Sequence, residues 1–276
     1  MYNNNMITCI IFTKDRACQL ELLLRTLKIR VDTSDINFKI IIDNCSDNDF
    51  ENGYKRLIER TSIPNLSWIH RKDRPFKDII LEHAHEECLM FLVDDVCFVE
   101  DFSTKSQEFQ TFFRNGRILT LSLRLSPAIT YCYAYGAKAD QPKLNNNIWE
   151  WKGGQGDWGV PTSIDGNIFK TRDIIEGLKT IKFLNPNELE GYLDIYAKTK
   201  LIEIPYALCF PKQKLVNFPL NKVQTFLNNK SQNISPKMLN ENYLAGKRLV
   251  LDKILQDINL NMCHVEVKNI TWEYEN

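Results

Sequence analysis

The chain has 276 residues, of which 43% are hydrophobic and 25% are charged, so it can bury a sizeable core and general disorder is not expected. Lysine and arginine together number 35, as do aspartate and glutamate, and the resulting formal net charge of zero lacks the basic excess typical of proteins that bind nucleic acid. This length accommodates one large α/β domain, or one such domain with a modest addition.

The cysteines and the N-terminus both indicate a reducing compartment. The eight cysteines include no CxxC pair and several lie within apolar runs, which favours buried thiols over a disulfide framework or a zinc site. Residues 1–6 have neither the basic start nor the cleavage sequence of a signal peptide. No apolar stretch approaches the ~20 residues that span a bilayer. We therefore expect a cytoplasmic protein without a transmembrane segment, for which peripheral contact with the inner face of a membrane stays open.

The N-terminal part of the chain alternates between apolar runs and amphipathic segments. Four runs have the length and composition of buried strands, at residues 7–12, 38–42, 66–70 and 89–93. A segment with apolar residues on one helical face follows each of the first three runs, the last of them over residues 76–88. Strands that alternate with helices in this way predict a mainly parallel α/β sheet flanked by helices.

The middle of the chain is less regular. The predicted elements are strands at 117–125 and 202–208, a long excursion at 131–147, a turn entering a strand at 163–169, and a helix at 185–197. Residues 149–159 contain three tryptophans and four glycines, a composition that suits a loop lining a pocket.

The tail changes character after residue 227. Residues 228–236 are polar and predict a linker. One amphipathic helix is predicted beyond it, marked by Leu239, Tyr243, Val250 and Ile254. A short apolar segment at 265–267 predicts an added edge strand. The organisation expected is thus one domain over residues 1–227 and an extension over 228–276.

Polar side chains follow three of the predicted strands, at the point where each strand ends. The clusters are Thr13 to Arg16, Asp43 to Asp47, and Asp94 with Asp95. Ligands of open parallel sheets bind beyond the carboxyl ends of the strands, so the three clusters are expected to share one site.

Asp94 and Asp95 are the strongest candidates for chemistry. Two adjacent carboxylates at the end of a buried strand are costly unless a positive charge compensates them. Mn²⁺ or Mg²⁺ prefers such oxygen ligands and can bridge to a diphosphate, so both residues are predicted to bind metal. The alternative is a solvated turn or a helix cap.

The other two clusters have similar alternatives. Asp43 can accept a hydrogen bond from a nucleobase, or it can stabilise an Asx-type turn. Lys14 and Arg16 at the start of a helix suit phosphate, or they are exposed charges on a capped helix. No glycine-rich phosphate loop follows the first strand, which argues against a dinucleotide or P-loop site.

The order and spacing of these segments resemble the nucleotide-binding half of GT-A glycosyltransferases, especially the family-2-like group. The matching segments are Phe12–Arg16, Ile42–Asp47 and Phe91–Asp95, within about residues 6–100. The last segment takes the place of the DXD-type metal motif, although Val96 fills its third position. The resemblance implies a Rossmann-like GT-A fold, a nucleotide-sugar donor with UDP-sugars favoured, and Mn²⁺ or Mg²⁺ as cofactor.

The resemblance also implies roles for individual residues. The implied nucleotide-binding residues are Thr13, Asp15, Arg16, Asp43 and Asp94, and the implied metal ligands are Asp95 and Asp94. Residues 1–100 would form the nucleotide-binding half of the catalytic domain and residues 101–227 the half for acceptor and donor sugar.

A glycine-containing substrate loop and an acidic helix are implied for the second half. Residues 154–159 and 163–169 can supply the loop, with Asp157, Trp158 and Asn167 as predicted substrate-binding residues. The alternative for the tryptophan is core packing.

An inverting enzyme needs a carboxylate that removes the proton from the acceptor hydroxyl. Glu190 is favoured as this base, and Asp165 and Asp157 are its rivals. The alternatives are an exposed helical glutamate and an ordinary turn aspartate.

The leading hypothesis is metal-dependent, inverting transfer of a sugar to a hydroxyl of a glycan or lipid-linked acceptor, in surface polysaccharide or glycoconjugate biosynthesis. A sugar-phosphate nucleotidyltransferase is a second reading, but it would carry a glycine-rich loop after its first strand. A non-catalytic nucleotide-sugar-binding domain is the third.

Overall fold

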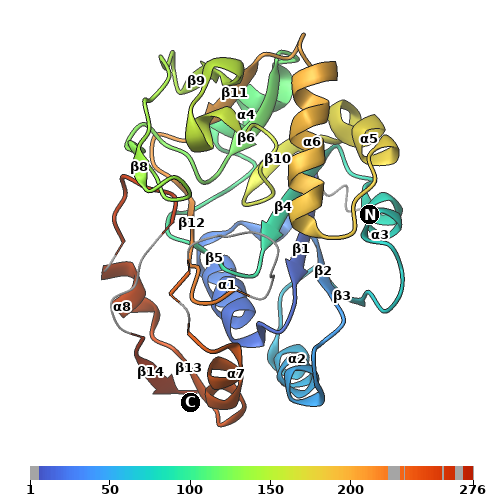
Figure 1. The fold of residues 1–276 in the computed structure, drawn as a ribbon, viewed down its shortest axis with the longest axis vertical. Helices are drawn as coiled ribbons and strands as arrows, with labels where there is room; N and C mark the ends of the chain where they lie inside the picture. The colour runs from blue at the N-terminus through green and yellow to red at the C-terminus, as the bar shows by residue number, and fades with distance from the viewer. Residues whose placement is uncertain (1–5, 223–230, 233, 257, 265–269, 276) are drawn as a thin grey trace.

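The computed structural model describes residues 6–222, 231–232, 234–256, 258–264 and 270–275. An eight-stranded sheet with the order β3-β2-β1-β4-β10-β6-β11-β9 forms its centre (Figure 1). The strands are β1 (Ile7–Thr13), β2 (Ile36–Ile42), β3 (Leu66–His70), β4 (Cys88–Val93), β6 (Ile118–Ser122), β9 (Ile148–Glu150), β10 (Asn167–Lys170) and β11 (Tyr206–Cys209). The four strands β3, β2, β1 and β4 are parallel, as are β6 and β11, whereas β10 runs antiparallel to both of its neighbours and β9 to β11. The predicted mainly parallel α/β fold is confirmed.

Helices cover both faces of this sheet. They are α1 (Ala17–Arg30), α2 (Asn48–Arg60), α3 (Phe76–His83), α4 (Gln107–Arg114), α5 (Thr171–Thr180) and α6 (Pro186–Lys200). Alternate residues of β1 belong to different apolar cores: Cys9 packs in the cluster that contains α1 and α2, and Ile10 in the cluster that contains α3, α5 and α6. A strand buried on both faces must be apolar throughout, which explains the continuous apolar run of β1.

Small elements complete the fold. They are β5 (Val96–Phe98) paired with β12 (Leu215–Asn217), β7 (Tyr131–Cys132) paired with β8 (Ala137–Lys138), and the 3-10 turns η1 (Thr33–Asp35), η2 (Trp151–Gly153) and η3 (Gly156–Gly159). All eight cysteines are free, and seven of them are buried, as expected from their apolar surroundings.

The tail differs from the prediction of one amphipathic helix. It forms α7 (Pro236–Leu244), β13 (Lys247–Leu249) and α8 (Leu251–Gln256). Gly246 has φ of +84°, a left-handed conformation that ends the helix and that other residues rarely adopt. The chain then pairs β13 with β14 (Trp272–Tyr274) in a separate two-stranded sheet, so this pair adds no edge to the central sheet. The predicted strand at 265–267 lies outside the described residues, as do 228–230 and 233 of the predicted linker.

Two other boundaries also differ from the prediction. The helix expected over 76–88 ends at His83, because Cys88 already begins β4. The strand expected from residue 202 begins at Tyr206, after a turn.

The tail is part of the same packed body. α7 contacts α1 and α2, and its Leu239 and Tyr243 are buried in the core (Figure 1). Further on, Asn217 N donates to Cys263 O at 2.8 Å, which brings the segment 258–264 back to the central sheet end. Across the described residues, every helix is too short or too polar to cross a bilayer.

Candidate active site

A pocket of about 600 Å³ opens beyond the carboxyl ends of β1, β2 and β4. Thr13, Asp43 and Asp94, which follow or end these strands, line one part of it. Asp165 and Glu190 line the opposite part, which the second half of the chain supplies. The third wall comes from residues 217–222 and from the tail. The three strand-end clusters therefore meet in one cavity, as their positions in the sequence predicted.

The loop after β1 is fixed by α2 and by the loop after β2. Tyr54 of α2 joins the Thr13 hydroxyl at 2.6 Å and accepts from Arg16 N at 3.1 Å. Asp15 has φ of +54° and accepts from both the backbone N–H and the hydroxyl of Ser46, at 3.0 and 2.6 Å. The first and second clusters are thus tied together through the Asp15 side chain.

Asp94 and Asp95 share one guanidinium. Arg16 Nη1 lies 2.9 Å from Asp94 Oδ1 and 3.0 Å from Asp95 Oδ2, while Lys14 N donates to Asp94 Oδ2 at 3.2 Å. Burial raises the pKa of the Asp94 carboxyl and Asp95 raises it further, whereas Arg16 lowers it. Arg16 also donates to both oxygens of Asn221, at 2.7 and 2.6 Å, and so connects the first loop to the third wall of the pocket.

Asp43 is held by an arginine that follows β3. Arg71 Nε donates to Asp43 Oδ1, and the Arg71 guanidinium lies over the Phe76 ring at 4.8 Å. Phe12 and Phe76 line the pocket beside Asp43. A flat apolar wall next to a carboxylate suits a planar ring that carries an N–H donor.

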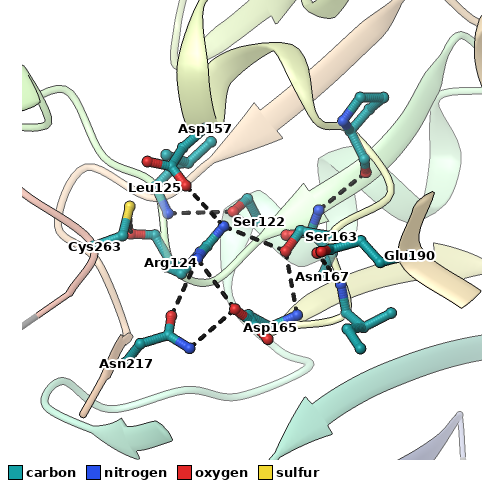
Figure 2. Close-up of polar contacts among 12 residues, drawn as sticks. Ser122, Arg124, Leu125, Asp157, Ser163, Asp165, Asn167, Glu190, Asn217 and Cys263 are labelled. Atoms are coloured by element: carbon teal, nitrogen blue, oxygen red, sulfur yellow. Dashed lines mark hydrogen bonds and ion pairs between the residues drawn. The ribbon is translucent and has the colours of Figure 1, made fainter. Parts of the chain in front are cut away.

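Arg124, just beyond β6, lies between two pocket carboxylates (Figure 2). Its Nη2 is 3.0 Å from Asp157 Oδ1 and its Nη1 is 3.2 Å from Asp165 Oδ2. It also donates to Asn217 Oδ1 at 3.1 Å and to the Ser163 hydroxyl at 3.3 Å. One buried cation therefore joins four segments around the second half of the pocket.

Asp165 is placed by a strained turn. Gly166 has φ of +91°, and a Cβ at this position would lie 2.6 Å from the Leu215 side chain, so the turn requires glycine. Asn217 Nδ2 donates to Asp165 Oδ2 at 3.0 Å. Burial raises the pKa of Asp165 to about 7, Arg124 opposes this rise, and Glu190 and Asp95 add to it.

Glu190 reaches the pocket from the first half of α6. Its Oε1 accepts from Ile164 N at 3.2 Å, which places it beside the Asp165 turn. The Asn185 side chain accepts from Glu188 N at 3.0 Å and caps the helix that presents Glu190.

Most of the predicted site residues line this pocket. These are Thr13, Arg16, Asp43, Asp94, Asp95, Asp157, Asp165 and Glu190. Asp15, Trp158 and Asn167 do not line it. Trp158 is fully buried against Trp149, with ring centres 4.9 Å apart. Asn167 Nδ2 donates to Pro161 O at 3.0 Å inside the fold.

Sequence reasoning missed Arg71, Arg124 and His264. Arg124 was hidden because the strand predicted over 117–125 included it, although a charged residue after a strand is the signal that identified the other clusters. His264 lines the pocket, stacks on Tyr133 at 4.8 Å, and its Nδ1 has no hydrogen-bond partner among the described residues. Nothing in the surrounding sequence distinguishes it.

Asp94 and Asp95 are the residues that could hold a divalent cation. Within the part of the chain that is described, no three side chains of His, Cys, Asp or Glu are grouped to hold a metal by themselves. Mg²⁺ is usually bound through one or two carboxylates together with water and substrate phosphates, rather than in an all-protein cage. Two adjacent carboxylates beside an open pocket fit a cation that arrives with a diphosphate, provided that Arg16 turns away from at least one of them.

Comparison with known proteins supports the class of enzyme that the motifs predicted. No protein-family model matches the chain. The chain is similar to the bifunctional glycosyltransferase pgtA of Dictyostelium discoideum, with 26% identity across 96% of this chain and 39% of the relative. It therefore spans well under half of that relative's length. This similarity confirms the resemblance to glycosyltransferases.

Solved structures overlap the chain in part. S. aureus TarS 1-349 matches 74% of this chain and 56% of its own length, with a TM-score of 0.46 and 13% identity. A cytidylyltransferase from Leptospira borgpetersenii matches 76% of this chain and 77% of its own length, with a TM-score of 0.45 and 11% identity.

Proposed function

We propose that the protein transfers a sugar from a nucleotide-sugar donor, with UDP-sugars favoured, to a hydroxyl of a glycan or lipid-linked acceptor. The observation that carries this proposal is the single pocket that joins the three strand-end clusters to the carboxylates of the second half. Similarity to a glycosyltransferase over nearly the whole chain supports it. The corresponding cellular role is the biosynthesis of surface polysaccharide or glycoconjugates at the cytoplasmic side of a membrane.

The nucleotide would lie over the ends of β1, β2 and β4. Asp43 is positioned to accept a hydrogen bond from the base, and Phe12 and Phe76 offer it an apolar surface. The diphosphate would then lie near Asp94 and Asp95. A divalent cation bound there would neutralise the charge that develops on the departing nucleoside diphosphate.

The acceptor hydroxyl would enter from the side of α6. Glu190 is proposed as the base that removes its proton while the oxygen attacks the anomeric carbon from the face opposite the leaving group, which inverts the anomeric configuration. Asp165 lies beside Glu190, whose Oε1 accepts from the backbone N–H of Ile164, the residue before Asp165. Asp165 itself is the rival base.

A panel of nucleotide sugars tests this proposal. UDP-, GDP- and CDP-sugars are incubated with the protein and Mn²⁺, with simple glycosides as acceptors, and release of the nucleoside diphosphate is measured. The expected result is metal-dependent release from one donor class. A nucleotidyltransferase would instead produce pyrophosphate from a nucleoside triphosphate and a sugar 1-phosphate, and a non-catalytic domain would bind a nucleotide sugar without turnover.

A further inference from the structure

Arg124 is a buried cation that takes no direct part in the proposed reaction. Its side chain is only 7% exposed, and its two charged partners come from different segments, η3 for Asp157 and the turn before β10 for Asp165 (Figure 2). Its other partners are the neutral oxygens of Asn217 and Ser163. A buried guanidinium with two oxygen partners on each Nη is held in one geometry, because movement would leave a charge unpaired.

The charges around Arg124 do not balance. Asp157 and Asp165 pair with it, and Glu190 and Asp95 also act on Asp165, so several carboxylates face a single guanidinium. Arg124 is the largest charge that opposes protonation of Asp165, which burial otherwise favours. The His264 imidazole nearby is held neutral by burial and by the same arginine, so it supplies no second cation.

We propose that Arg124 is a positioning residue for sugar transfer: it fixes the Asp157 and Asp165 segments as one pocket wall and holds Asp165 as an anion beside Glu190. This inference rests on the proposed function, because its effect on the reaction passes through the proton that Glu190 accepts. An anionic Asp165 places a second negative charge beside the carboxylate that receives this proton, and a protonated Asp165 would remove that charge. Arg124 itself forms and breaks no bond.

Two substitutions separate the effect of the positive charge of Arg124 from the effect of its several N–H donors. Arg124→Gln removes the cation, so the acid limb of the profile of kcat against pH should move upward by about one pH unit or more. At pH 7, kcat should fall by up to roughly tenfold. The KM for the donor should change less than about threefold, because the nucleotide is bound at the ends of β1, β2 and β4. Arg124→Lys keeps the charge but cannot hold both carboxylates, so kcat should fall while the limb moves by less than about half a unit.

A double variant shows whether Arg124 acts through Asp165. In an Asp165→Asn background, Arg124→Gln should no longer move the acid limb. Arg25→Gln is the matched control, since Arg25 is a largely buried arginine on α1 that lies 3.0 Å from Glu21 and donates to Leu249 O at 2.6 Å, away from the pocket. It should lower the Tm and leave the pH profile of the wild type.

The proton on Asp165 can also be observed without turnover. Carboxyl ¹³C resonances of aspartate-labelled protein are titrated, with Asp165→Asn identifying the resonance, and Arg124→Gln should move its midpoint upward. Wild-type protein that releases no nucleotide would refute the proposed function, while this titration still tests Arg124. An unmoved limb and midpoint in Arg124→Gln would overturn the inference, as would wild-type kcat in Arg124→Lys if the glutamine variant does not fold.

Discussion

Arg16 supplies the positive charge beside the two carboxylates of the proposed metal site. Its guanidinium pairs with both Asp94 and Asp95, yet one positive charge cannot neutralise two carboxylates, so the pair keeps an excess of negative charge. A divalent cation that brings a diphosphate can use this excess.

Asp95→Asn tests the metal at this position. The amide is a poorer ligand than the carboxylate, so the affinity for UDP in the presence of Mn²⁺ should fall by roughly tenfold or more, while the weaker affinity without metal should change little. Isothermal titration calorimetry with and without Mn²⁺ measures both. Asp101→Asn is the control, because Asp101 is an exposed partner of Arg30 outside the pocket. Equal metal dependence in Asp95→Asn and wild type would contradict the assignment.

Glu190→Gln separates chemistry from binding. The substitution keeps an acceptor for Ile164 N but removes the base, so kcat should fall on the order of 10²- to 10⁴-fold. Affinity for UDP should remain within about threefold, because the nucleotide is proposed to bind at the ends of β1, β2 and β4, whereas Glu190 lies on α6. Glu188→Gln on the same helix is the control, and a normal kcat in Glu190→Gln would transfer the role of base to Asp165.

At the scale of elements, hydrophobic periodicity predicted the alternating strands and helices, and missed the features that depend on long-range packing. The strands β1 and β4 are largely apolar runs, β2 ends in one, and polar residues at the carboxyl ends of these three strands gave most of the first pocket wall. Trp158 lies in the loop that the sequence assigned to the pocket, but nothing local says which of its side chains turn inward, and this one fills the core. Arg124 was missed because it lay within a predicted strand. The amphipathic pattern of the tail continues past Gly246, but the left-handed backbone of this residue ends the helix there.

α2 supports the site although it contributes nothing to the pocket lining. Tyr54→Phe would remove the phenol that joins the Thr13 hydroxyl to Arg16 N, and would leave the part-buried Arg16 N–H without this acceptor. The free energy of unfolding should fall by about 1–3 kcal/mol, and UDP should bind more weakly because the loop after β1 loosens. Thermal unfolding and calorimetry measure the two effects. Tyr274→Phe, at an exposed tyrosine, should show neither.

At the scale of the whole molecule, the tail contributes to the pocket although it is distant from it in the sequence. Residues 258–264 pass the end of the central sheet, where Thr130 N and Tyr131 N donate to Asn261 O, at 2.9 and 3.1 Å. The next residues place Cys263 against Arg124 O and His264 in the pocket wall. The last part of the chain and the loop after β6 therefore depend on one another, so stability and the pocket should respond together when this contact is disturbed.

Acid is the simplest way to disturb it. Burial, with Arg124, lowers the pKa of His264 to about 4, below the ~6.5 of an unfolded histidine, so the unfolded chain binds a proton that the folded one rejects. Stability from this residue is complete above pH 6.5 and is lost as the pH falls toward 4.

Asp165 has the opposite pKa shift, upward to about 7, and partly masks the loss in the wild type. Its contribution cancels when the wild type is compared with His264→Gln, which lacks only the imidazole. Urea unfolding at pH 7 and pH 4.5 should show the wild type losing about 2 kcal/mol more than the variant. Equal losses in both proteins would contradict the lowered pKa of His264 at the pocket wall.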